Sequence, residues 1–230
     1  DSSTSRGLGD VYKRQIDDLT GLVGRGKPDQ YSPDLSLFVL DAGIRLLETR
    51  PLDLLYLSLS DLVQHKHAPD APEAHAFMNA VDARVARLIE LGATVGIVAD
   101  HGMNDLCHDD GQPNVIYLGD VLDEAFGART TRVICPITDP FVKHHGALGG
   151  FVRVHLMDES LDRDMVLGTI AELPGVELAL TGEDAAARFD FPLDREADIV
   201  VVGALGVALG ARAMDHDLSQ LAGERLRSHG

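Results

Sequence analysis

The sequence of 230 residues has no tryptophan and only two cysteines, and aromatic residues make up 5% of it. Cys107 and Cys135 do not have the spacing of a metal-binding or redox motif. We therefore expect two free thiols in a reducing compartment, which predicts a cytoplasmic location.

Basic residues are also scarce: the sequence has 20 Lys and Arg and 37 Asp and Glu, which gives a net charge of -17 at pH 7. Proteins that bind nucleic acid backbones or anionic membranes need a basic surface, so neither partner is expected. The longest apolar stretch, residues 199–211, is too short and too rich in glycine to span a bilayer. A small anionic substrate is still compatible with this charge, because bound divalent ions can dominate the field inside a site.

The first 15 residues lack any apolar period and resemble a translated sequencing adapter, so we expect residues 1–15 to be non-native. We expect the remainder to be an internal piece of a longer protein. A homodimer is left open beside the monomer.

Residues 16–105 are expected to form the core α/β part. Ser32 and Pro33 have the pattern of a helix start, and apolar spacing predicts a helix to about residue 48. A second helix is predicted between Asp70 and Gly92. The apolar runs 54–60 and 94–99 predict two buried parallel strands around it, a βαβ unit.

In residues 106–197 the sequence pattern changes to short predicted strands that alternate with helices, and we expect a smaller inserted α+β lobe. The predicted strands are 115–118, 131–134, 151–155 and 176–180, and the predicted helices are 160–173 and 183–189. Residues 198–230 are expected to return to the core, beginning with a strand at 198–202. His144 and His145, inside the lobe, are weighed for a role at the substrate.

Carboxylates and imidazoles follow both predicted core strands, and these are the ligand types of a hydrolytic zinc centre. Asp61 and His65 follow the first strand, Asp100 and His101 follow the second, and His229 lies near the end of the sequence. Ends of neighbouring parallel strands share one edge of a sheet, where open α/β sheets build their sites. Any one of these residues alone would most simply be a helix cap or a solvated side chain, whereas the set predicts a metal site. Five ligands exceed what one tetrahedral zinc needs, so two ions are expected.

Three segments carry a resemblance to a known family. SLSDLVQHKHAP, ADHGMN and LRSHG are similar to the metal-binding segments of the alkaline phosphatase superfamily. Within it, the sequence most resembles the phosphonoacetate hydrolases, through stretches such as YSPDLSLFVLDAGIRLLE and HDLSQLAGERLRSHG that cover most of residues 16–230.

The resemblance implies a parallel sheet flanked by helices with a smaller inserted α+β cap lobe, and a hydrolase that cleaves the carbon–phosphorus bond of phosphonoacetate to acetate and phosphate. It implies one zinc held by Asp61, His65 and His229 and a second held by Asp100 and His101. It also implies a Thr nucleophile and substrate-binding residues upstream of residue 16, so no catalytic or substrate-binding residue is assigned here. The expected partner is a small phosphonate, and without those upstream residues we expect the fragment itself to be inactive.

Other functions are left open. A nucleotide pyrophosphatase or phosphodiesterase could use the same ligands, although the few aromatic residues disfavour a slot for a nucleobase. A phosphoglycerate-mutase-like enzyme would need further ligand clusters that are not evident. A non-catalytic remnant that binds metal is the alternative from another class.

Overall fold

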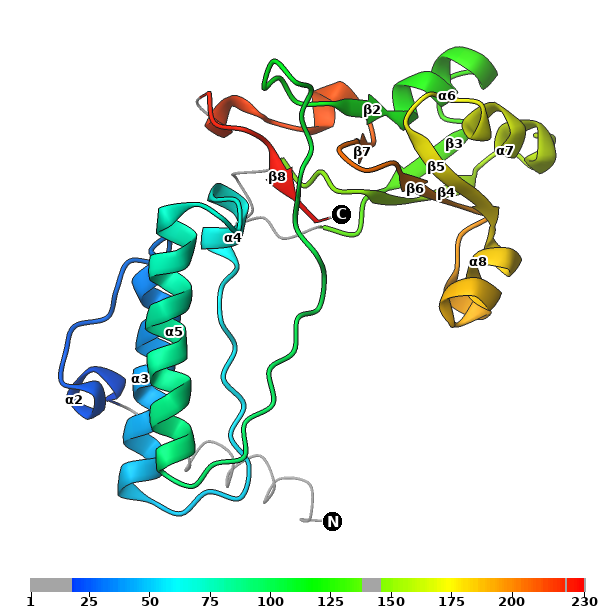
Figure 1. Ribbon diagram of the computed structural model, residues 1–230. Coiled ribbons are helices and arrows are strands. Elements are labelled where there is room, and N and C mark those ends of the chain that lie inside the picture. Colours follow the sequence, from blue (N-terminus) through cyan, green and yellow to red (C-terminus); the bar gives the residue numbers. More distant parts are fainter. Residues whose placement is uncertain (1–17, 138–145, 222, 230) are drawn as a thin grey trace, which may run out of the picture. The chain divides into compact units, whose positions relative to one another are not determined.

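The computed structural model describes residues 18–137, 146–221 and 223–229. The expected adapter segment, residues 1–15, lies outside this range, as do His144 and His145. The described chain is a mixed α/β protein (Figure 1), which confirms the expected class. By internal contacts it divides into a helical unit, Asp1–Val63 with His67–Ile97, and a sheet unit, Gln64–Lys66 with Val98–Gly230. The domain boundaries expected from the sequence stay predictions.

Local sequence signals define the helices of the helical unit, α2 (Leu19–Val23), α3 (Pro33–Thr49) and α5 (Pro72–Glu90). The hydroxyl of Ser32 accepts a hydrogen bond of 3.1 Å from the amide of Asp34, so the predicted cap of α3 is confirmed. Arg50, before a proline, is extended and ends the helix. The predicted second helix is confirmed as α5, which is followed by Gly92 at a φ of 91°.

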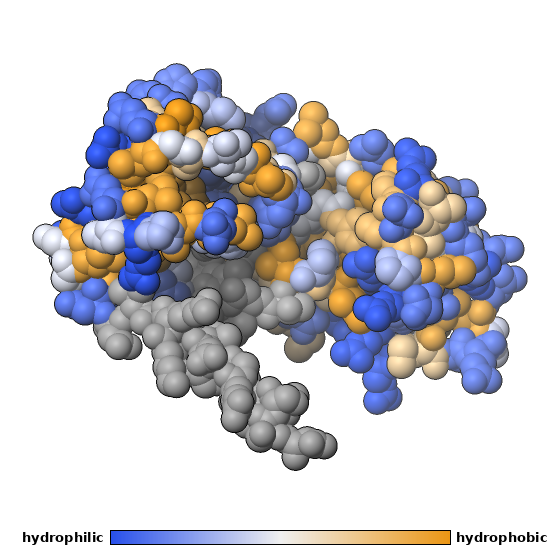
Figure 2. Space-filling model, turned by 90° about the horizontal axis from the view of Figure 1, so that it is seen from below, coloured by the Kyte–Doolittle hydropathy of each residue, from blue (hydrophilic) through white to orange (hydrophobic). Residues whose placement is uncertain are grey.

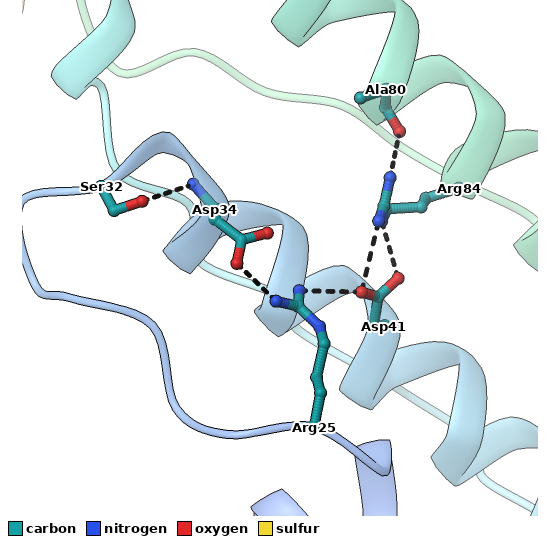
Figure 3. A network of polar contacts seen from close by, with 6 residues as sticks. All are labelled: Arg25, Ser32, Asp34, Asp41, Ala80 and Arg84. Carbon is teal, nitrogen blue, oxygen red and sulfur yellow. Dashed lines mark hydrogen bonds and ion pairs between the residues drawn. The ribbon is translucent and has the colours of Figure 1, made fainter.

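Helices α3 and α5 lie side by side and run in the same direction (Figure 1). Leu37 of α3 and Val81 of α5 both pack against a buried cluster that includes Ala74 and Phe77 of α5. Polar contacts add to this packing (Figure 3): Asp41 on α3 accepts a hydrogen bond of 2.7 Å from Arg84 on α5 and one of 3.0 Å from Arg25. One carboxylate thus ties α3 to α5 and to the segment after α2.

The two strands predicted at 54–60 and 94–99 are wrong for this chain, because neither segment belongs to a strand. Leu54 is 88% exposed, Tyr56 87% and Val98 92%. Figure 2 shows hydrophobic side chains reaching the surface between hydrophilic ones on the face it displays. An apolar run predicts a buried strand only if a neighbour supplies ladder hydrogen bonds, and the described residues supply none here.

The sheet unit contains a four-stranded antiparallel sheet with the order β3-β4-β6-β5. Its strands are β3 (Thr131–Ile134), β4 (Phe151–Leu156), β5 (Val176–Thr181) and β6 (Ile199–Gly203), which confirms the strands predicted at 131–134, 151–155, 176–180 and 198–202. β6 lies between β4 and β5, and its partners are therefore the strands of the expected lobe.

Three helices pack on this sheet (Figure 1): α6 (Leu118–Phe126), α7 (Arg163–Ala171) and α8 (Gly182–Phe189). The predicted helices are confirmed as α7 and α8, whereas the sequence analysis missed α6 and extended the preceding strand to its first residue. Alternate residues of β4 and β6 turn to one face and meet α6 and α7 there. The fully buried residues of this core are Leu118, Leu122, Val152, Val154, Val166, Ile170, Ile199, Val201 and Leu209.

Two short strand pairs complete the sheet unit. β2 (Val115–Tyr117) pairs in parallel with β7 (Ala208–Gly210), and β1 (Asn104–Asp105) pairs in antiparallel with β8 (Arg227–Ser228). Three single-turn 3-10 helices are described: η1 (Leu193–Arg195) lies between α8 and β6, and η2 (Ala213–Asp215) and η3 (Ser219–Leu221) lie between β7 and β8. Parallel pairing among the described residues is limited to β2 and β7.

Within the described ranges, none of the helices has the length and apolar character that crossing a bilayer requires.

Candidate metal centre

The short helix α4 (Leu62–Lys66) positions the first two candidate ligands. Asp61 occupies its N-cap position, but its carboxylate makes no capping hydrogen bond to the helix. His65 lies four residues later, on the same side of the helix by its 3.6-residue repeat. Leu62 and Val63 between them are buried, which anchors the turn.

The third candidate, His229, directly follows β8 and is held through its backbone. Leu226 is fully buried before the strand, and its carbonyl accepts a hydrogen bond of 2.8 Å from the amide of Leu106. The carbonyl of His229 accepts one of 2.8 Å from the amide of Gly150. A side chain at Gly149 would place its Cβ 3.1 Å from that carbonyl oxygen, so a glycine fits this close approach.

These elements bring Asp61, His65 and His229 together. Each offers one ligand atom, and the three atoms lie within 4.8 Å of one another. His65 is only 5% exposed, and its ring centroid lies 5.3 Å from that of His229. One carboxylate oxygen and two imidazole nitrogens are the donor set of a catalytic divalent metal ion such as zinc.

The hydrogen bond of His65 fixes which nitrogen faces the site. Its Nδ1 lies 2.8 Å from the carbonyl oxygen of Arg227. A carbonyl can only accept, so Nδ1 donates this hydrogen bond, and Nε2 is the ring nitrogen that can act as a metal ligand. Histidines that bind metals are commonly oriented by such a bond from their other ring nitrogen.

The other two predicted ligands, His101 and Asp100, differ in their surroundings. The ring of His101 stacks on that of His229, with centroids 3.7 Å apart and planes at 25°. The Nε2 of His101 is 3.4 Å from a carboxylate oxygen of Asp100, whose side chain is 90% exposed. Among the described residues, only Asp61, His65 and His229 form a group of three metal-ligand side chains. The assignment of all five as ligands stays a prediction.

Two charged residues at this site were missed by the sequence analysis. Arg227 is 7% exposed, its Nε donates a 3.0 Å hydrogen bond to the carbonyl of Gln64, and its Nη1 bonds to a carboxylate oxygen of Asp105. Nothing in the spacing of Asp105 and Arg227 distinguishes them from solvated charges. The only signal is their position, a few residues after Asp100–His101 and two residues before His229.

The sequence profile of the type I phosphodiesterase/nucleotide pyrophosphatase family matches residues 29–230. Among solved structures, phosphonoacetate hydrolase from Sinorhizobium meliloti 1021 in complex with phosphonoformate is 45% identical, with a TM-score of 0.87. The match covers 94% of this chain and 52% of that one. The same enzyme in complex with phosphonoacetate matches at 43% identity and a TM-score of 0.84, with the same coverage.

A more distant match gives the fold alone. Murine ectonucleotide pyrophosphatase/phosphodiesterase 5 has 17% identity and a TM-score of 0.51, over 90% of this chain and 49% of that one. The chain thus spans about half the length of the structures it matches, which share an alkaline-phosphatase-like architecture. Because the family profile extends over most of the sequence, the chain belongs to the type I phosphodiesterase/nucleotide pyrophosphatase family.

Proposed function

We propose that this chain is the metal-binding part of a hydrolase that cleaves the carbon–phosphorus bond of phosphonoacetate. The observation that carries the proposal is the 45% identity to a phosphonoacetate hydrolase over 94% of the chain. The gathering of Asp61, His65 and His229 supports it, because such an enzyme needs a charge that stabilises phosphonate oxygens.

The donor set fits zinc. His65 presents Nε2 because its Nδ1 is bonded to a carbonyl, and His229 and Asp61 add a nitrogen and an oxygen donor. Asp100 and His101 are proposed as the donors of a second zinc. Zinc bound here would supply Lewis acidity that stabilises charge on the phosphonate and favours an ionised nucleophile.

The described residues are proposed to bind the metal ions and to orient them. His65 is buried and hydrogen-bonded to the carbonyl of Arg227, and His229 is held through its backbone, so both imidazoles would be positioned before substrate arrives. A Thr nucleophile and the residues that bind the substrate carboxylate are proposed to lie outside these 230 residues. In the net reaction, water adds across the bond: phosphorus gains an oxygen, and the leaving carbon gains a proton to give acetate.

A second candidate function is a nucleotide pyrophosphatase or phosphodiesterase, which the family profile favours directly. A non-catalytic protein that binds metal is the third. A cytoplasmic location, two zinc ions and a homodimer accompany the first proposal as predictions.

The test is phosphate release by a longer protein that includes this chain. It would be given zinc, with and without a chelator, and offered phosphonoacetate beside a nucleotide phosphodiester. We expect chelator-sensitive release from phosphonoacetate alone. Turnover of the diester alone would overturn the substrate, and turnover of neither would favour the non-catalytic reading.

Substitutions of His65 and His229 test their proposed role as metal ligands. Because residues that only orient metal ligands cost about 10–100-fold when changed, we expect His65→Ala and His229→Ala each to lower activity by more than about 100-fold. His75→Ala, an exposed histidine on α5, is the matched control and is expected to retain activity. Equal activity of His65→Ala and His75→Ala would contradict the proposed role of His65.

A further inference from the structure

Arg227 contacts two of the segments that surround the candidate metal centre. Its side chain is 8% exposed, so the guanidinium is buried. Its Nε donates to the carbonyl of Gln64 at 3.0 Å, while its own carbonyl accepts from Nδ1 of His65 at 2.8 Å. Two consecutive residues of α4 are therefore bonded to one residue of β8, in opposite directions.

Asp105 supplies the charge that lets this arginine be buried. One carboxylate oxygen bonds to Nη1 of Arg227, and the other accepts a 3.1 Å hydrogen bond from Nε of Arg225. Asp105 is also the strand partner of Arg227 in the β1–β8 pair. A buried guanidinium without a carboxylate is costly, so Asp105 fixes the direction in which Arg227 points.

The arginine side chain matters although the acceptor for His65 is a backbone carbonyl. Any residue at position 227 would offer that carbonyl, but only a side chain that reaches Gln64 and Asp105 together holds it in place. The guanidinium has five N–H donors in a planar fork and can serve both partners. A lysine has its donors on a single nitrogen and cannot span two separated partners in the same way.

We propose that Arg227 is a positioning residue of the metal centre, which holds α4 against β8 so that His65 keeps its Nδ1–H tautomer and faces His229. Asp105 is its counter-charge. The proposal rests on the proposed metal site for its functional meaning, while the tautomer of His65 can be measured without any metal.

The first experiment measures the imidazole nitrogens of His65 by ¹⁵N NMR in the metal-free full chain. Arg227→Lys keeps the charge opposite Asp105, and Arg225→Lys is the matched control, since Arg225 also pairs with Asp105 but is 46% exposed. We expect a single Nδ1–H tautomer in the parent chain and in Arg225→Lys, and a mixture of tautomers in Arg227→Lys. An unchanged His65 tautomer in a folded Arg227→Lys variant would overturn the proposal.

The second experiment measures zinc affinity by competition with a chelator, on the same variants and on Arg227→Met, which keeps much of the volume. We expect Arg227→Lys to weaken zinc binding by about 10–100-fold and Arg225→Lys to change it by less than about threefold. If Arg227→Met unfolds, the zinc affinity of Arg227→Lys still tests the role of Arg227. A parent chain that binds no zinc would contradict the proposed metal site. Equal zinc affinity of Arg227→Lys and the parent would contradict the proposed role of Arg227.

Discussion

Two segments with nearly the same apolar pattern have opposite surroundings. β6 has a hydrogen-bonded strand on each side, and its residues Ile199, Val200 and Val201 are fully buried. The run 54–60 is as apolar, yet Leu54 and Tyr56 are almost fully exposed, and no described residue pairs with it as a strand. An apolar pattern therefore reports that a segment needs burial, whereas neighbouring segments decide whether it is buried.

The structures that this chain matches are about twice its length. We expect a longer protein of this family to provide strand partners for 54–60 and 94–99.

The largest effect is expected in amide hydrogen exchange. Amides of β6 should exchange at least about 1,000-fold more slowly than those of residues 55–59, because the former open only with the sheet. Mass spectrometry of the 230-residue chain and of a longer protein would measure both segments. We expect residues 55–59 to become protected in the longer protein, and continued rapid exchange there would contradict the expected pairing.

The second-largest difference between β6 and the run 54–60 is expected in the stability lost when a side chain is truncated. Ile199→Ala removes a fully buried side chain, and we expect it to lower the free energy of unfolding of the sheet unit by about 2–5 kcal/mol. Leu54→Ala, at an 88% exposed position, should change stability by less than about 0.5 kcal/mol. Urea denaturation followed by circular dichroism measures both, and similar losses would mean that Leu54 is buried in solution.

A buried ion pair next to β6 should have a smaller effect. Glu196 is 1% exposed at its side chain and accepts hydrogen bonds of 2.6 and 3.1 Å from Arg153. We expect Glu196→Gln to cost about 1–3 kcal/mol, by urea denaturation at pH 7. The exposed pair of Arg163 with Glu183 is the control, and Glu183→Gln should have little effect.

The same pair predicts a pH dependence. Burial alone would raise the pKa of Glu196, but the hydrogen bonds from Arg153 and from the amide of Ala197 outweigh it and lower the pKa below its usual value. The stabilisation is therefore complete above about pH 4.5 and is lost as the pH falls through the lowered pKa. The stability difference between the parent chain and Glu196→Gln should shrink on acidification, and a constant difference from pH 7 to about pH 3 would contradict this account.

The smallest effect is expected in the helical unit, at Asp41. Burial raises the pKa of this carboxyl group, but hydrogen bonds from Arg84 and Arg25 outweigh it and the net pKa is lowered. Its contribution is fully present above the usual aspartate pKa of about 3.9 and is lost as the pH falls through the lowered pKa. We expect Asp41→Asn to cost about 1–2 kcal/mol at pH 7, since the side chain is only partly buried.

The exposed carboxylate of Asp53, in the same unit, gives the matched control. Asp53→Asn should leave the thermal unfolding midpoint nearly unchanged, whereas Asp41→Asn should lower it. Equal midpoints would mean that the contacts between Asp41 and the two arginines contribute nothing to the packing of α3 against α5.

The fold could be predicted from the sequence wherever its signals are local. The Ser32 cap of α3, the helix predicted between Asp70 and Gly92 and the short strands predicted at 131–134, 151–155, 176–180 and 198–202 depend on signals within a few residues, and each was confirmed. The strands at 54–60 and 94–99 failed because a strand exists only by pairing with another segment. Helix α6 was missed because its first residue, Leu118, continues the apolar run of β2.

The candidate site followed the same rule. Asp61 and His65 are one helical turn apart, so their proximity follows from local geometry. Asp100 was expected to be directed by a paired strand, and without that pairing its side chain is 90% exposed. The contribution of Arg227 depends on contacts with residues more than 100 positions away, which no local pattern encodes.

The exposed run 54–60 also has a consequence for the survival of this chain in a cell. An extended, apolar, unpaired segment is the form in which chaperones bind polypeptides and proteases cleave them, and it can also template edge-to-edge association. We therefore expect the cellular abundance of this chain to depend on how quickly Leu54 and Tyr56 are covered, more than on the stability of the well-packed sheet unit.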